Sequence, residues 1–159
     1  MTDEQSTLLT RLLRTLIIEE ELLTALAELS EAQQQALLQS AFITIESINE
    51  EMLAVASGLV PLEQERLELT IALGVGTLTE ASQLAASAGV SGFGPAHERL
   101  RKAATRFRER QEGNAALVLN AMRLRDRWVN LLAGMISPTY GSAGKREVAQ
   151  QRQIMSKSA

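Results

Sequence analysis

Apolar residues recur every three or four positions along most of the chain, which is the spacing of one face of an α-helix. The first stretch predicts a helix over about residues 3–29, with a stripe made of Leu9, Leu12, Leu13, Leu16, Leu23 and Leu26. Ser30 and Gln33 have the spacing of a capping box, so either a second helix begins there or the first continues with a kink. The next stripe predicts a helix over about 31–57 whose coiled-coil-like seam consists of Leu38, Ala41, Phe42, Ile45, Ile48, Met52 and Val55.

Glycine, proline and threonine mark the ends of two shorter helices in the middle of the chain. Gly58 is a helix stop, and Pro61 suits the first turn of the helix that follows. Gly74 ends that helix, and Thr77 with Glu80 again has the spacing of a capping box. The segment therefore predicts helices over about 62–73 and 78–87, followed by a glycine-rich loop over 89–95.

The longest regular stripe predicts a single helix over about 95–136, which would extend about 60 Å at about 1.5 Å per residue. Its seam consists of Leu100, Ala103, Phe107, Arg110, Asn114, Leu117, Ala121, Leu124, Trp128, Leu131 and Met135. Arg110 and Asn114 are polar at positions where the pattern calls for apolar residues. A seam asparagine often sets the register or the oligomeric state of packed helices, and Asn114 is interpreted either in that way or as a polar contact with a bound partner.

This pattern predicts an all-α protein, an elongated antiparallel helical bundle with coiled-coil-like packing. The composition agrees, because 25 of the 159 residues are leucine and aromatic residues make up only 3%. Residues 1–136 are expected to form one domain. Residues 137–159 hold few large apolar side chains to offset the entropy of ordering, so they are expected to form a flexible tail.

The net charge of −3 conceals an uneven distribution along the chain. Residues 1–98 carry 15 acidic and three basic side chains, whereas residues 99–159 carry four acidic and 13 basic ones. The favoured interpretation is that the two parts pack against each other in one bundle; nucleic-acid binding is the alternative, and the scarcity of aromatic residues among the basic ones disfavours it. Within the acidic part, Glu19, Glu20 and Glu21 are interpreted as a solvated helix face, or else as an acidic site for a partner.

The inventory of reactive side chains excludes most catalytic and metal-binding chemistry. The chain has no cysteine and one histidine, His97, so it cannot assemble a disulfide, a Cys/His zinc site or a paired-histidine metal centre. The longest apolar run, Leu131 to Ile136, is far shorter than the roughly 18 residues of a membrane span, and the acidic N-terminus is unlike a secretory signal. We therefore expect a cytoplasmic binding protein that is not an enzyme and uses no cofactor or metal.

The segment from Asn114 to Gly144 combines several distinctive features. Asn114 opens the run Asn-Ala-Ala-Leu-Val-Leu in the long helix, which continues through Arg127, Leu131 and Leu132. A sharp Pro-Thr-Tyr-Gly-Ser-Ala-Gly segment over 138–144 then leads into a basic tail. This combination, in a short all-α chain, resembles the FlgN family of flagellar export chaperones.

The resemblance implies a cytoplasmic chaperone of type III flagellar export that binds the hook-associated proteins FlgK and FlgL and delivers them to the export gate protein FlhA. It implies that Tyr140 and Gly141 dock on the gate, and that the cargo-binding helix includes Asn114, Leu117, Val118, Ala121, Leu124, Trp128 and Leu131. The residues by themselves leave Trp128 open to core packing and Tyr140 open to packing back on the bundle. A homodimer is compatible with these patterns, and the alternative function is a homo-oligomeric coiled-coil scaffold or adaptor without chaperone activity.

Overall fold

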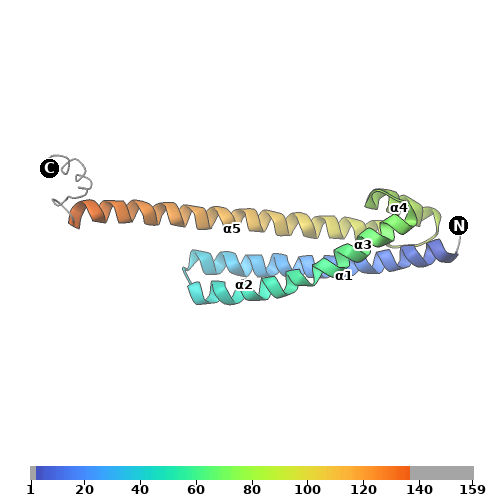
Figure 1. Ribbon diagram of the computed structural model, residues 1–159, viewed down its shortest axis with the longest axis horizontal. Coiled ribbons are helices and arrows are strands. Elements are labelled where there is room, and N and C mark those ends of the chain that lie inside the picture. Colours follow the sequence, from blue (N-terminus) through green and yellow to red (C-terminus); the bar gives the residue numbers. More distant parts are fainter. Residues whose placement is uncertain (1–2, 137–159) are drawn as a thin grey trace. The chain divides into compact units, whose positions relative to one another are not determined.

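The computed structural model describes residues 3–136, without the side chains at positions 124, 125, 127, 128, 131, 132, 134 and 136. Over this range the chain forms helices and no strands, which confirms the prediction of an all-α protein. The helices are α1 (Asp3–Leu38), α2 (Phe42–Ser57), α3 (Leu59–Leu73), α4 (Leu78–Ser87) and α5 (Phe93–Ile136). Figure 1 shows α2 returning antiparallel beside α1. The predicted tail, 137–159, lies outside the described residues.

Helix α1 is longer than predicted, because it passes through Ser30 without a break. The Ser30 hydroxyl donates a 2.8 Å hydrogen bond to the carbonyl oxygen of Leu26 in the preceding turn, instead of capping a new helix. Ser30 is fully buried there. The predicted boundary between helices over 3–29 and 31–57 is therefore wrong, and the alternative in which the first helix continues is the correct one.

The turn between α1 and α2 lies at residues 39–41. Ser40 adopts a left-handed conformation with φ 55°, and the Ala41 amide donates to the Ala36 carbonyl oxygen at 2.9 Å. The turn interrupts the seam predicted for 31–57: Leu38 ends α1, Ala41 lies in the turn, and Phe42 begins α2. Leu38 and Phe42 are 62% and 75% exposed, so their assignment to the seam is wrong, whereas Ile48 in the middle of α2 is buried.

Helices α2 and α3 are separated by a single residue, Gly58, which itself has helical dihedral angles. Its amide donates to the Val55 carbonyl oxygen at 3.0 Å, and α3 then begins at Leu59, three residues before the predicted start. Pro61 lies within the first turn of α3, where its missing N–H breaks no helical hydrogen bond. The axis bends between the two helices, as Figure 1 shows.

The ends of α3 and α4 have the capping that the sequence predicts. Gly74 closes α3 in the left-handed conformation, with φ 71°. Thr77 accepts a 3.1 Å hydrogen bond from the Glu80 amide through its hydroxyl oxygen, and the Glu80 carboxylate accepts one of 2.9 Å from the Gly76 amide. Helix α4 has the predicted bounds for this reason.

The hydrophobic core gathers residues from four helices. Helix α5 begins at Phe93, two residues before the predicted start, and the Phe93 side chain is fully buried in this core. A buried phenylalanine of this kind contributes about 3 to 5 kcal/mol relative to alanine. The cluster comprises Leu9, Leu12 and Leu16 of α1, Leu69 and Leu73 of α3, Ala81 and Ala85 of α4, and Phe93 and Leu100 of α5.

The chain divides into two compact units, residues 1–115 and residues 116–159. The first contains α1 to α4, the beginning of α5 and the core. The second begins within α5, and the structure describes its residues 116–136. Near the end of the first unit, Gly113 lies in the interior of α5, where an added methyl group would meet no atom within 4 Å.

Candidate functional site

Asn114, the first residue of the candidate cargo-binding segment, is buried in the first unit and faces α1. Its side chain is 3% exposed. The amide nitrogen donates to the main-chain oxygen of Ser30 at 2.8 Å and to the side-chain oxygen of Gln33 at 2.8 Å. These bonds fix the position of α5 along α1, which supports the interpretation of Asn114 as a register residue. Its role toward a partner stays a prediction.

Three further side-chain amides, those of Gln33, Asn49 and Gln111, complete a polar cluster around Asn114. Gln111 Nε2 donates to the Ser30 hydroxyl oxygen at 2.7 Å and to the Gln33 side-chain oxygen at 3.2 Å. Gln33 Nε2 in turn donates to the side-chain oxygen of Asn49 on α2 at 2.6 Å. The cluster therefore joins α1, α2 and α5. Among the described residues nothing donates to the buried Asn114 Oδ1, and an unpartnered acceptor of this kind costs about 1 to 3 kcal/mol.

Arginines of α5 pair with glutamates of α1 within the first unit. Arg99 lies 4.0 Å from Glu20, and Glu31 lies 3.7 Å from Arg106 and 3.2 Å from Arg110. For residues 99–115 these pairs confirm the prediction that the basic part packs against the acidic part; for the rest of the basic part it stays a prediction. Each pair is partly exposed, so it adds little stability, but together the pairs select which face of α5 meets α1.

Glu19 is an exception to the prediction of a solvated acidic face. It is 5% exposed, and both of its carboxylate oxygens accept hydrogen bonds from Arg66 Nε, at 3.1 and 3.0 Å. Burial raises the pKa of this carboxyl, and Arg66 opposes that shift. The solvated-face prediction is wrong for Glu19, because Arg66 on α3 supplies a partner that lets the carboxylate enter the interior.

The second unit carries apolar side chains that are open to solvent along α5. The exposed residues, each between 42% and 67% exposed, are Val118, Leu119, Met122, Val129 and Met135. The spacing from Val118 to Met122 is four residues and from Met122 to Val129 seven, which places these three on one side of the helix. A chain that keeps such residues in water offers a surface to an apolar ligand.

The remaining predicted site residues are only partly described. Leu117 is half-buried and Ala121 is exposed. The side chains of Leu124, Trp128 and Leu131 lie outside the described part, as do Tyr140 and Gly141 entirely. Sequence reasoning named Val118 but missed its neighbours Leu119 and Met122. The four- and seven-residue spacing from Val118 to Met122 and Val129 was the available signal for Met122.

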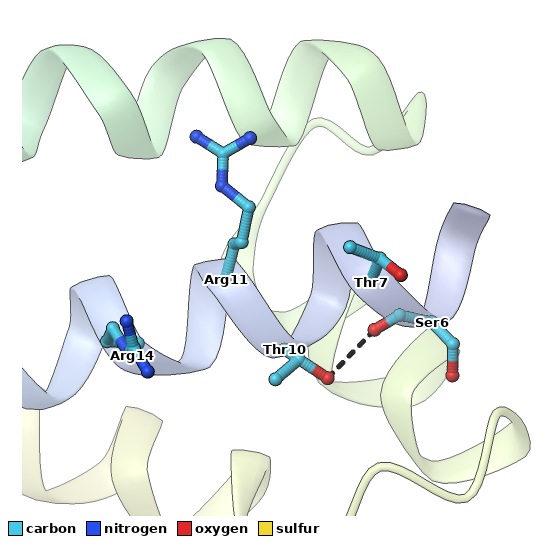
Figure 2. A pocket seen from close by; sticks show the side chains of 5 residues that line it. All are labelled: Ser6, Thr7, Thr10, Arg11 and Arg14. Atoms are coloured by element: carbon cyan, nitrogen blue, oxygen red, sulfur yellow. Dashed lines mark hydrogen bonds between the residues drawn. The ribbon is translucent and has the colours of Figure 1, made fainter. Parts of the chain in front are cut away.

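A shallow hollow of about 330 Å³ lies on α1, lined by Ser6, Thr7, Thr10, Arg11 and Arg14. Figure 2 shows Arg11 extending toward a neighbouring helix, in the direction away from Ser6 and Thr10. Its guanidinium lies 3.6 Å from Glu65, and the Thr10 hydroxyl donates to the Ser6 carbonyl oxygen at 2.9 Å. Thr7 likewise donates to the Asp3 carbonyl oxygen at 2.9 Å, and the lining side chains do not converge on a common point in Figure 2, so the hollow is not interpreted as an anion site.

Comparison with known proteins assigns the chain to a family. A sequence model of the FlgN protein family matches residues 1–147, which is nearly the whole length. The chain belongs to the FlgN family. No curated protein and no solved structure matches it at a significant level. The range matched to FlgN includes the exposed apolar face of α5 and also Tyr140 and Gly141.

Membership of the FlgN family makes this chain a flagellar export chaperone. No helix in the described part of this FlgN protein is both long and apolar enough to cross a membrane. The described features that suit a chaperone are the open apolar side chains of α5 and the polar cluster that holds the middle of the same helix against α1.

Proposed function

We propose that this FlgN-family protein binds the hook-associated proteins FlgK and FlgL in the cytoplasm through residues 116–136 of α5 and delivers them to the export gate protein FlhA. The observation that carries the proposal is the open apolar face of Val118, Met122 and Val129 in a chain of this family. An amphipathic segment of the cargo would cover that face and so be kept from aggregating.

The segment that follows Met122 is rich in arginine, which gives the proposed site a chemical preference. Arg123, Arg125 and Arg127 follow Met122 in the sequence, with Asp126 as the acidic residue among them. A cargo segment with apolar residues on one side and carboxylates at its margins would therefore suit the helix. In the same proposal Tyr140 and Gly141 contact the gate, so cargo binding and gate docking use separate parts of the chain.

The proposal is tested by co-purification and titration with a C-terminal fragment of FlgK. A triple variant, Val118→Ser, Met122→Ser and Val129→Ser, is expected to bind at least about tenfold more weakly, because each serine removes apolar area from the interface. These residues are exposed, so the variant keeps its fold, which circular dichroism verifies. The control, Val60→Ser with Ile71→Ser, removes apolar side chains of α3 that are more exposed than those of the proposed face, and it is expected to bind the fragment normally.

Two results would contradict the proposal: no stable complex with the FlgK fragment at micromolar concentrations, or equal binding by the triple variant and the wild type. Light scattering separates the alternative function. A homo-oligomeric scaffold requires a measured mass of at least twice the 17.3 kDa of one chain, together with no binding of the FlgK fragment.

A further inference from the structure

Helices α2 and α3 carry a second exposed apolar row, on the side that faces away from α1. The inward side of the same helices is occupied by the buried Ile48, Leu69 and Leu73. The outward row consists of side chains that are between 52% and 75% exposed, Phe42, Leu53, Val60, Leu67 and Ile71.

The spacing of this row is that of a helix seam. Leu53, Val60 and Leu67 are each seven residues apart, and Ile71 follows one turn later. The seven-residue repeat continues across Gly58, because that residue has helical dihedral angles and joins the two helices almost without interruption. Measured along the two helix axes, which bend at Gly58, the row from Leu53 to Ile71 covers about 27 Å at about 1.5 Å per residue, which is long enough for a partner helix of several turns.

Carboxylates flank the row, and within α2 and α3 no unpaired basic side chain does. Glu46, Glu50, Glu63 and Glu68 are all exposed. Arg66 is the single basic residue between positions 42 and 73, and it is held by Glu19 on α1. An apolar seam bordered by glutamates at both margins is the complement of a helix that carries lysine or arginine at its own margins.

The same charges disfavour a symmetric dimer through this surface. A two-fold interface brings each patch against itself, so Glu50, Glu63 and Glu68 of one copy would meet the same carboxylates of the other. Like charges at the margins of paired helices destabilise the pair. A second copy therefore does not suit the row, and a basic partner does.

We propose that Leu53, Val60, Leu67 and Ile71, with their flanking glutamates, form a docking surface for a basic amphipathic helix of another protein. This surface belongs to α2 and α3 of the first unit, whereas the proposed cargo face belongs to residues 116–136. The two proposals can therefore fail independently of each other.

The test uses a fluorescently labelled synthetic peptide of four heptads, with leucine at both seam positions and lysine at both flanking positions. Its lysines prevent the peptide from pairing with itself. Binding to the full chain is followed by anisotropy, and a peptide with glutamate at the flanking positions is the matched control. We expect the lysine peptide to bind, with an affinity that falls as salt is added. The glutamate peptide suits the proposed cargo face instead, so any binding of it is expected to be lost in the Val118→Ser, Met122→Ser and Val129→Ser variant, which should still bind the lysine peptide.

Variants of the chain then locate the binding. Leu53→Ser with Leu67→Ser is expected to weaken binding of the lysine peptide at least about tenfold, because two seam contacts are lost. Glu50→Gln, Glu63→Gln and Glu68→Gln together are expected to weaken it and to flatten its salt dependence. Val118→Ser with Met122→Ser is the control and is expected to leave this binding unchanged. Circular dichroism confirms that each variant remains helical.

Four results would overturn the proposal. They are no binding at about 0.1 mM lysine peptide, equal binding of the two peptides by the Val118→Ser, Met122→Ser and Val129→Ser variant, undiminished binding by the Leu53→Ser and Leu67→Ser variant, and self-association of the wild-type chain that Leu53→Ser abolishes. The last result would assign the surface to a second copy.

Discussion

The Asn114 amide on α5 donates a hydrogen bond of 2.8 Å to the main-chain oxygen of Ser30 on α1, a residue 84 positions earlier in the chain. Because both helices are long and their apolar residues recur regularly, hydrophobic packing alone would tolerate a shift by one heptad. A buried amide that finds its acceptor in one register removes that freedom. Asn114 thus sets where α5 lies along α1.

Asn114→Ala is expected to lower the free energy of unfolding by about 1 to 3 kcal/mol, since two hydrogen bonds in a buried cluster are lost. Urea denaturation followed by circular dichroism measures the change. Asn120→Ala is the matched control. Asn120 is exposed on the same helix, so this substitution makes the same gain in helix propensity but breaks none of the hydrogen bonds of the cluster. Equal stability of the two variants would show that the cluster adds nothing.

Arg66→Ala is expected to destabilise the chain by about 2 to 3 kcal/mol, because it leaves the Glu19 carboxylate buried without its partner. This is less than the about 3 to 5 kcal/mol for a fully buried pair, since the Arg66 side chain is 30% exposed. In the double variant Arg66→Ala with Glu19→Gln, much of the loss should be recovered. Arg101→Ala, at an exposed pair with Glu98, is the control and should have no measurable effect. A double variant less stable than Arg66→Ala alone would refute this account.

The stability contribution of Glu19 is expected to decrease as the pH rises. Burial raises the pKa of this carboxyl above its usual 4.5, so ionisation is harder in the folded chain than in the unfolded one. The contribution is fully present below about pH 4.5 and is lost as the pH rises through the raised pKa. The free energy of unfolding of the wild type minus that of Glu19→Gln should therefore fall between pH 4 and pH 7.

The pKa of Glu98 is shifted in the opposite direction from that of Glu19, so Glu98→Gln is a control for the same pH series. A hydrogen bond from Arg101 lowers the pKa of Glu98, so its contribution is lost as the pH falls. The difference between wild type and Glu98→Gln should then rise, or stay flat, as the pH increases. If the free energy of unfolding of the wild type minus that of Glu19→Gln also rose with pH, the pKa of Glu19 would be shifted in the other direction.

Gly113→Ala is expected to stabilise the chain by about 1 kcal/mol, because glycine in a helix interior costs about that much relative to alanine and the methyl group has free space. Gly92→Ala should have the opposite effect. Gly92 has φ 85°, a conformation that residues with a side chain rarely adopt. Thermal and urea denaturation measure both variants, and destabilisation by Gly113→Ala would show that the space is needed.

Tyr140→Ala is expected to leave binding of the FlgK fragment unchanged and to weaken docking on FlhA, if the cargo face and the gate contact are separate. The aromatic ring of a hot-spot tyrosine typically supplies more than about 2 kcal/mol to an interface. Titration of the variant with each partner separately measures both effects. Equal loss of both bindings would refute the division of labour between α5 and the Tyr140-Gly141 pair.

Local chemistry explains which parts of the fold could be predicted from the sequence. Thr77 and Glu80 bond to main-chain amides within four residues, and Gly74 needs only its own dihedral angles, so the ends of α3 and α4 depend on neighbours in the chain. The pairing of acidic and basic parts was also predictable, because it depends on charge summed over long segments.

The errors arose where a distant residue decides the outcome. Ser30 has the spacing of a cap, yet its hydroxyl is used by Leu26 and by Gln111, which lies 81 residues away. Glu19 is buried because Arg66 lies 47 residues further along the chain. Phe42 continues the three- and four-residue spacing of the predicted seam. Because the turn at 39–41 ends α1 before it, Phe42 begins a new helix, α2, and its side chain is exposed. In the candidate site, Val118 was predicted through the family resemblance, whereas nothing in the sequence pattern predicted the exposure of Leu119.

The core that joins Leu9 to Phe93 has a consequence for how the chain is made. These residues are 84 positions apart, so at about 5 to 20 residues per second the ribosome needs about 4 to 17 s to add Phe93 after Leu9. During that time the leucines of α1 cannot pack against Phe93, a fully buried residue of the same core. The nascent protein thus exposes an apolar helix face for several seconds, which is the same hazard that it is proposed to prevent in its cargo.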